Sequence, residues 1–78
     1  MSLRIGDIVN YNLQLSLNFV LVGIDGNRAD IIHIVSPNHH LRGKNGVYKP
    51  GKKDSLMGRK TVHLGDVWSC GLRWGGEL

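Results

Sequence analysis

The chain has 78 residues, of which 41% are hydrophobic, with ten basic and six acidic side chains and one cysteine. This length allows one domain with one small core and excludes a second domain. No apolar run approaches the roughly 18 residues that span a bilayer, and a single cysteine excludes an intramolecular disulfide. We therefore expect a soluble protein that makes no membrane contact and, because no signal-peptide pattern precedes Arg4, a cytoplasmic one.

The net charge of +4 is distributed unevenly along the chain. The segment 42–60 holds seven basic residues and one acid, Asp54. Charge that is segregated in this way indicates the kind of partner rather than the fold. The seven cations are Arg42, Lys44, Lys49, Lys52, Lys53, Arg59 and Lys60.

The N-terminal part of the sequence alternates between apolar and polar residues. From Val9 to Phe19 every second residue is apolar, and this period of two predicts a β-strand with one face in water. A continuous strand as far as Ile24 would be about 50 Å long at ~3.3 Å per residue, too long for a domain of this size. Asparagine and serine side chains between Asn12 and Asn18 favour a turn, so the leucines there are expected on a projecting loop or hairpin.

Residues 19–35 predict a β-hairpin around which the rest of the domain is organised. Two runs of branched aliphatic residues flank Gly26 and Asn27, which tolerate the positive φ of a tight turn. In the register that this turn predicts, the facing pairs are Ile24–Ala29, Val22–Ile31, Leu21–Ile32 and Val20–His33. Apolar side chains then lie on both faces of the hairpin.

Both faces of this hairpin therefore need cover, whereas a small barrel has one interior. We expect the second face to be covered either by the C-terminal strands or by another subunit, most simply in a symmetric homo-oligomer. A tryptophan close to the C-terminus is a further candidate for an interface. The candidate interface residues are Val20, Val22, Ile24, Ile31 and Trp74.

Residues 36–60 are predicted to be largely irregular, because glycine and proline recur there without periodicity. Residues 47–49 are a candidate short strand, and residues 54–57 a candidate single helical turn. Strand character resumes at residues 61–64 and again at residues 67–74. The alternation in the last segment predicts that Trp68, Cys70, Leu72 and Trp74 share a half-buried face.

Four or five short strands without a helix of consequence predict an all-β domain, closed or nearly closed as a small barrel. The opening Ile5-Gly6-Asp7-Ile8-Val9, followed by an irregular stretch and a long central hairpin, resembles the small SH3-like barrels of the Tudor and KOW type. The resemblance implies an SH3-like or related barrel of four to five antiparallel strands, here with a long basic loop. The chain lacks the clustered aromatic cage with which Tudor domains bind methylated side chains. Because members of that fold bind nucleic acid, peptides or other subunits, the fold does not choose among these ligands.

The basic segment 42–60 is the main functional signal. Its cations suit a phosphate backbone, and Tyr48 is available to stack on a base. We expect a non-enzymatic module that binds nucleic acid or another polyanion. The candidate contact residues are Arg42, Lys44, Tyr48, Lys49, Lys52, Lys53, Arg59 and Lys60. Two alternatives stay open: a solvated loop without a ligand, and a self-associating or protein-binding adaptor that uses the apolar face of the hairpin.

Catalytic and metal-binding patterns in the chain are weak. Residues 46–52 match the glycine and lysine spacing of a phosphate-binding loop, but Lys53 stands where a serine or threonine should reach magnesium. Cys70 is expected to be an unreactive core thiol, and His33 a partly buried structural histidine. The remaining histidines have neither zinc spacing nor a carboxylate placed to orient them. We therefore expect no metal, no cofactor and no enzymatic activity.

Overall fold

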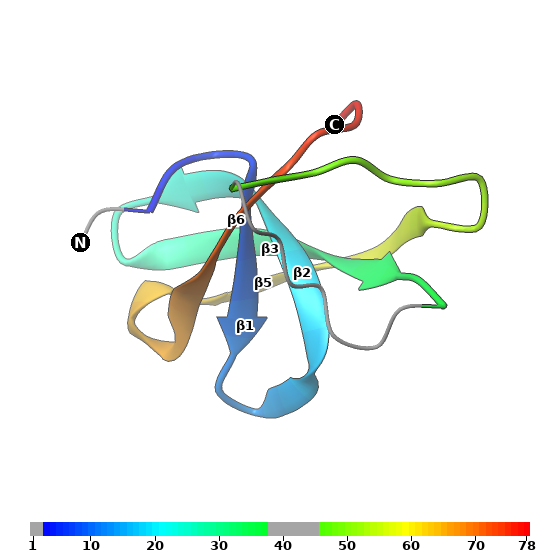
Figure 1. The fold of residues 1–78 in the computed structure, drawn as a ribbon. Helices are drawn as coiled ribbons and strands as arrows, with labels where there is room; N and C mark the ends of the chain where they lie inside the picture. Colours follow the sequence, from blue (N-terminus) through cyan, green and yellow to red (C-terminus); the bar gives the residue numbers. More distant parts are fainter. Residues whose placement is uncertain (1–2, 38–45) are drawn as a thin grey trace.

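The computed structural model describes residues 3–37 and 46–78, and this part of the chain is all-β with no α-helix. The elements are β1 (Asp7–Tyr11), β2 (Gln14–Asp25), β3 (Arg28–Val35), β4 (Val47–Tyr48), β5 (Ser55–His63), the 3-10 turn η1 (Leu64–Asp66) and β6 (Val67–Trp74). They form one sheet in the order β4-β6-β1-β2-β3-β5, in which β4 runs parallel to β6 and the other neighbours are antiparallel (Figure 1). The all-β prediction is confirmed. The sheet has six strands instead of four or five, it is mixed, and no pairing between described residues closes it.

Two consecutive hairpins form the centre of the sheet. Asn12 and Leu13 make the turn between β1 and β2, inside the segment predicted to turn, and Leu13 is 75% exposed. Gly26 and Asn27 make the turn between β2 and β3, where Gly26 adopts φ +60°. Glycine adopts this conformation without steric cost. Both turn predictions are confirmed.

None of the described segments is a helix of the length and hydropathy needed to cross a membrane.

A bulge in β2 changes the register of the central hairpin. Ile24 lies opposite Ala29 as predicted, but the pairing shifts between Leu21 and Gly23. The observed pairs beyond it are Leu21–Ile31, Val20–Ile32 and Phe19–His33, in place of the predicted Val22–Ile31, Leu21–Ile32 and Val20–His33. The predicted register is wrong there because an extra residue on one strand moves every later pair by one position.

Both faces of the central hairpin are buried, each in its own cluster. The first cluster consists of Val9, Phe19, Leu21, Ala29, Ile31, Val62 and Val67. The second consists of Ile8, Val20, Ile34 and Leu72, with Tyr48, Cys70 and Trp74 among the residues packed against it. Strand β6 contributes to both clusters, so the C-terminal strand helps to cover both faces.

This burial corrects part of the predicted interface. Val20 and Ile31 are both 0% exposed, so the chain's own core occupies them and they offer no surface to a partner. Val22 and Trp74 are half-buried and pack against the second cluster. Ile24 is 42% exposed. Of the five candidates, Ile24 thus has the largest exposed part.

Strand β5 replaces much of the predicted basic loop. The predicted helical turn at residues 54–57 and the irregular structure up to Lys60 are wrong, because β5 begins at Ser55 and pairs along β3. The register of this pair shifts between Ile32 and His33, and Gly58 adopts φ +79°. A bulge of this kind breaks the period of two by which a strand is recognised. The short strand at residues 47–49 is confirmed for Val47–Tyr48.

Candidate polyanion-binding surface

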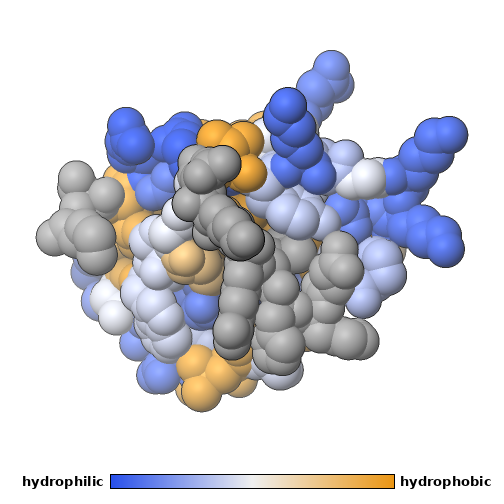
Figure 2. Space-filling model, viewed as in Figure 1, coloured by the Kyte–Doolittle hydropathy of each residue, from blue (hydrophilic) through white to orange (hydrophobic). Residues whose placement is uncertain are grey.

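Five of the seven predicted cations lie in the described part of the chain. Arg42 and Lys44 lie outside the described residues. The β4–β5 connection carries Lys49, Lys52 and Lys53, and we call residues 49–54 the lysine loop. The other two cations, Arg59 and Lys60, lie on β5. Figure 2 shows hydrophilic side chains standing away from the body on the side where the β4–β5 connection lies in Figure 1.

Asp54 holds the lysine loop in place. Its carboxylate Oδ2 accepts hydrogen bonds from the Tyr48 hydroxyl and, over 2.8 Å, from the Gly51 N–H. The backbone N–H of Asp54 also donates to the Gly51 carbonyl over 3.2 Å. Hydrogen bonds from Ser36, Tyr48 and the Gly51 N–H lower the pKa of Asp54 from its ordinary value. The only acid of the segment 42–60 is therefore engaged in holding the loop.

None of the three lysines of the loop forms an ion pair with a described acid. Lys49, Lys52 and Lys53 are all exposed. The ion pairs formed between described residues, Arg59–Asp30 and Arg73–Asp7, involve none of them. Three ammonium groups thus project from a connection of six residues whose backbone is tied by hydrogen bonds.

The lowered pKa of Asp54 predicts how the stability of the protein changes at acid pH. Because the folded-state pKa lies below the ordinary 3.8, the ionised carboxylate stabilises the folded protein fully above about pH 3.8, and this contribution is lost as the pH falls through the folded-state pKa. In Asp54→Asn the side chain no longer titrates. We expect the thermal midpoint of the wild type to fall more steeply than that of Asp54→Asn between about pH 5 and pH 2.5. Parallel curves for the two proteins would show that Asp54 does not hold the loop through its charge.

Arg59 is neutralised within the chain. Its guanidinium Nη2 lies 2.9 Å from Asp30 Oδ2, and the Thr61 hydroxyl donates to Asp30 Oδ1 over 2.6 Å. The hydrogen bonds from Thr61 and Arg59 lower the pKa of Asp30. Arg59 would have to give up this partner, or share it, to contact a phosphate.

Lys60 is engaged on the opposite face of β5 from Arg59, since neighbouring residues of a strand alternate. Its Nζ donates to Gln14 Oε1 over 2.6 Å. It also lies 5.7 Å from the ring centroids of both Tyr11 and Phe19. An ammonium over an aromatic face is attracted by the ring quadrupole. The structure therefore separates Arg59 and Lys60 from the lysine loop, although the sequence places all of them in one basic segment.

Tyr48 makes structural contacts within the chain. Its ring is half-buried and packs against Trp74, with centroids 5.9 Å apart and planes tilted by 32°. Its hydroxyl is held by Asp54. The Trp74 indole donates from Nε1 to the carbonyl of Glu77 over 3.3 Å. Both aromatic residues serve packing in this structure, and the side of the Tyr48 ring that faces Trp74 is not available to a base.

The described histidines and the cysteine have structural partners. His33 packs against Phe19 with ring centroids 5.6 Å apart, and His63 Nδ1 accepts from the Gly65 N–H over 3.0 Å. Cys70 Sγ donates to Asn10 Oδ1 over 2.8 Å, and burial raises the pKa of the thiol to about 11. A thiol that stays protonated at neutral pH is a poor nucleophile. Within the described residues, no group of three or more histidine, cysteine or acidic side chains could hold a metal ion. His39 and His40 lie outside these residues.

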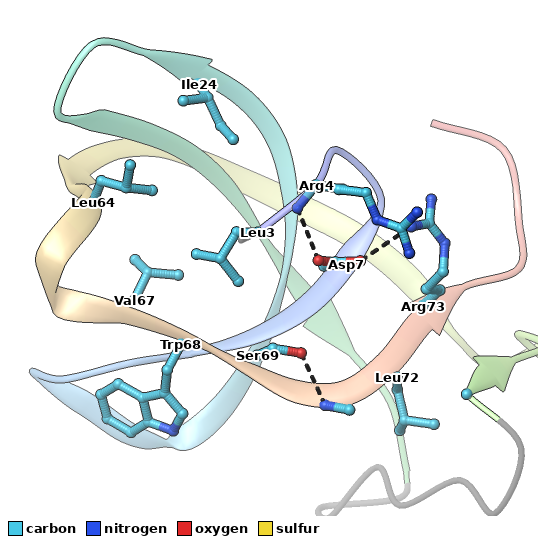
Figure 3. A pocket seen from close by; sticks show the side chains of 12 residues that line it. Leu3, Arg4, Asp7, Ile24, Leu64, Val67, Trp68, Ser69, Leu72 and Arg73 are labelled. Carbon is cyan, nitrogen blue, oxygen red and sulfur yellow. Dashed lines mark hydrogen bonds and ion pairs between the residues drawn. The ribbon is translucent and has the colours of Figure 1, made fainter. Parts of the chain in front are cut away.

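The sequence did not reveal a groove of about 740 Å³ that runs along β6 (Figure 3). The alternation in β6 predicts Trp68 on the half-buried face, but Trp68 is 43% exposed and lies at this groove. The pairing of β6 with β1 shifts between Ile8 and Val9, and Gly71 adopts φ +82°. Cys70, Leu72 and Trp74 do share the second cluster, as the alternation predicts, so of the four residues only Trp68 departs from the prediction.

Comparison with known proteins finds no matching family model, no matching curated protein and no matching solved structure. We therefore infer function from this chain's own geometry and charge.

Proposed function

We propose that this protein is a non-enzymatic module that binds a polyanion, with the phosphate backbone of a nucleic acid as its ligand. The observation that carries the proposal is the use of Asp54 inside the lysine loop. Neutral donors hold the ionised Asp54, and none of the described ion pairs involves Lys49, Lys52 or Lys53, so three positive charges and one negative charge leave the lysine loop with a net charge of +2. Contacts of lysine with phosphates give affinity with little base specificity.

The hydrogen bonds of the loop favour this proposal over a loop that serves only solubility. A tied backbone keeps the three lysine positions close together before a ligand arrives. Less conformational entropy is then lost on binding than if the backbone had to be ordered at that moment. Solubility alone requires exposed charge but no such fixation.

We also propose that the fold is related to the small SH3-like barrels. The opening Ile5-Gly6-Asp7-Ile8-Val9 and the long central hairpin support a relationship to the small SH3-like barrels, with β4 as an added parallel strand. A fold of that type would present the lysine loop from a rigid sheet, but it does not itself select the ligand.

The binding surface can be located by titrating the 15N-labelled protein with an oligothymidine of about 12 nucleotides and with a duplex of similar length at about 50 mM salt. We expect the largest changes in amide chemical shift within the lysine loop. The control region is the end of β5 that is far from the lysine loop. There His63 pairs with Arg28, which is also an exposed cation. Shifts confined to that end, or none at all with either ligand, would contradict the proposal.

A further inference from the structure

Among the described residues, strand β6 has one edge that is only partly paired. On one side it pairs with β1, from Arg73 opposite Asp7 to Val67 opposite Tyr11. On the other side β4 pairs with Arg73 and Trp74 alone. Among the described residues, positions 67–72 therefore have no neighbouring strand on this side. The N–H and C=O groups of an open edge can pair with an incoming strand.

A side chain provides a hydrogen bond at this edge. The backbone N–H of Gly71 donates to the Ser69 hydroxyl over 3.0 Å, as the dashed line beside Ser69 in Figure 3 shows. A local side-chain bond of this kind competes with pairing to another strand and can be exchanged for it. Gly71 is exposed, so an incoming chain can approach its backbone.

Six of the twelve residues that line the groove along this edge are apolar. Its apolar lining residues are Leu3, Ile24, Leu64, Val67, Trp68 and Leu72. Leu3 and Leu64 pack against the first core cluster, and Val67 belongs to it. Figure 3 shows Ile24 across the space from β6. A volume of about 740 Å³ is within the range of sites that hold several apolar groups of a ligand.

One end of the groove is positively charged. Asp7, which is 7% exposed, accepts from Arg73 Nη1 over 3.2 Å and from the backbone N–H of Arg4 over 2.9 Å. Arg73 Nη2 also donates to the Ile5 carbonyl over 3.1 Å. No acid in the described part of the chain pairs with the Arg4 guanidinium. Two cations against one carboxylate leave this end with a net positive charge.

We propose that an extended acidic segment of a partner protein binds in this groove as an added strand on β6. The backbone of the segment pairs with residues 67–72, alternate apolar side chains fill the groove, and a carboxylate lies beside Arg4 and Arg73. Charge favours an acidic partner over a second copy of this chain, whose own net charge is +4. This inference does not depend on the lysine loop.

Three fluorescein-labelled nonapeptides that alternate glutamate with valine, isoleucine or phenylalanine are suitable probes. We expect saturable binding of at least one by fluorescence anisotropy, with a Kd below about 1 mM. The matched control carries N-methyl groups on alternate backbone nitrogens, which keep every side chain but block pairing along one edge. When the methylated edge is the one that would pair with β6, we expect the peptide to bind at least about tenfold more weakly than the unmethylated peptide does. Absence of saturable binding by all three, or equal binding of the methylated peptide, would overturn the proposal.

Two pairs of variants test the groove itself. Trp68→Ala should weaken binding by about tenfold or more, whereas Met57→Ala, which removes a side chain 60% exposed on β5, should change it by less than about twofold. Arg4→Gln should weaken binding more than Arg28→Gln does, because Arg28 is an exposed cation that does not line the groove. Equal effects within both pairs would overturn the proposal. The comparison of the methylated with the unmethylated peptide uses only the wild-type protein, so it tests the proposal even if Trp68→Ala does not fold.

A second copy of the chain is the competing occupant of this edge. Light scattering of the protein without peptide, at tens of micromolar, measures its mass before and after Trp68→Ala. A dimer that this substitution dissociates would place a second copy in the groove and would overturn the proposal of an acidic partner.

Discussion

Leu21→Ala should lower the free energy of unfolding by about 2 to 5 kcal/mol. Leu21 is 0% exposed, belongs to the first core cluster and lies opposite Ile31 in the central hairpin. Truncation removes buried apolar surface and leaves a cavity that the sheet fills only in part. A domain of this size has a total stability of about 4 to 12 kcal/mol, so the variant loses much or all of it. Urea denaturation followed by circular dichroism measures the loss.

Leu15→Ala is the matched control for this substitution. It makes the same chemical change on the same strand, but Leu15 is 63% exposed near the β1–β2 turn. We expect its free energy of unfolding to stay within about 0.5 kcal/mol of the wild type. If the two variants were equally destabilised, the central hairpin would not organise the core.

The elements with an uninterrupted local pattern could be predicted from the sequence. Gly26 and Asn27 require a turn, and the branched aliphatic residues on each side require strands, so the central hairpin was predictable. The turn at Asn12 and Leu13 followed from the length limit on a continuous strand. Strand β6 was also expected at its observed bounds, Val67–Trp74.

Two of the features that failed prediction, the register of the central hairpin and the extent of β5, involve a bulge. The extra residue in β2 moved Leu21 from the predicted partner Ile32 to Ile31. The bulge at Gly58 interrupts the alternation of β5, so residues 55–60 of this nine-residue strand were predicted as irregular, whereas residues 61–63 were predicted as strand. A bulge depends on how two strands fit together, and the sequence of either strand alone does not indicate it.

The charge of the candidate site could be predicted from the sequence, but the partners of its side chains could not. Lys49, Lys52 and Lys53 were expected on an exposed connection and lie there. The capture of Arg59 by Asp30 joins residues 29 positions apart, and no local pattern indicates such a contact. The role of Asp54 in holding the loop likewise depends on Tyr48, which was expected to face a ligand.

Replacement of Lys49, Lys52 and Lys53 together by glutamine should remove most nucleic-acid binding and leave the fold intact. The three side chains are exposed and form no ion pair with a described acid, so the free energy of unfolding should change by less than about 0.5 kcal/mol. At about 50 mM salt we expect the affinity for a duplex to fall more than about tenfold, because three phosphate contacts are lost. Arg28→Gln is the control, since Arg28 pairs with His63 at the opposite end of β5 from the loop.

The slope of log affinity against log salt concentration tests the proposed binding most directly, because it reports the number of phosphate contacts. Three lysine contacts contribute about −2.7 to the slope for a duplex and about −2 for a single strand. We expect the wild type and Arg28→Gln to show slopes at least this steep, and the triple glutamine variant to lose about this amount. An affinity that does not change with salt, or a triple variant that keeps the wild-type slope, would contradict binding through the lysine loop.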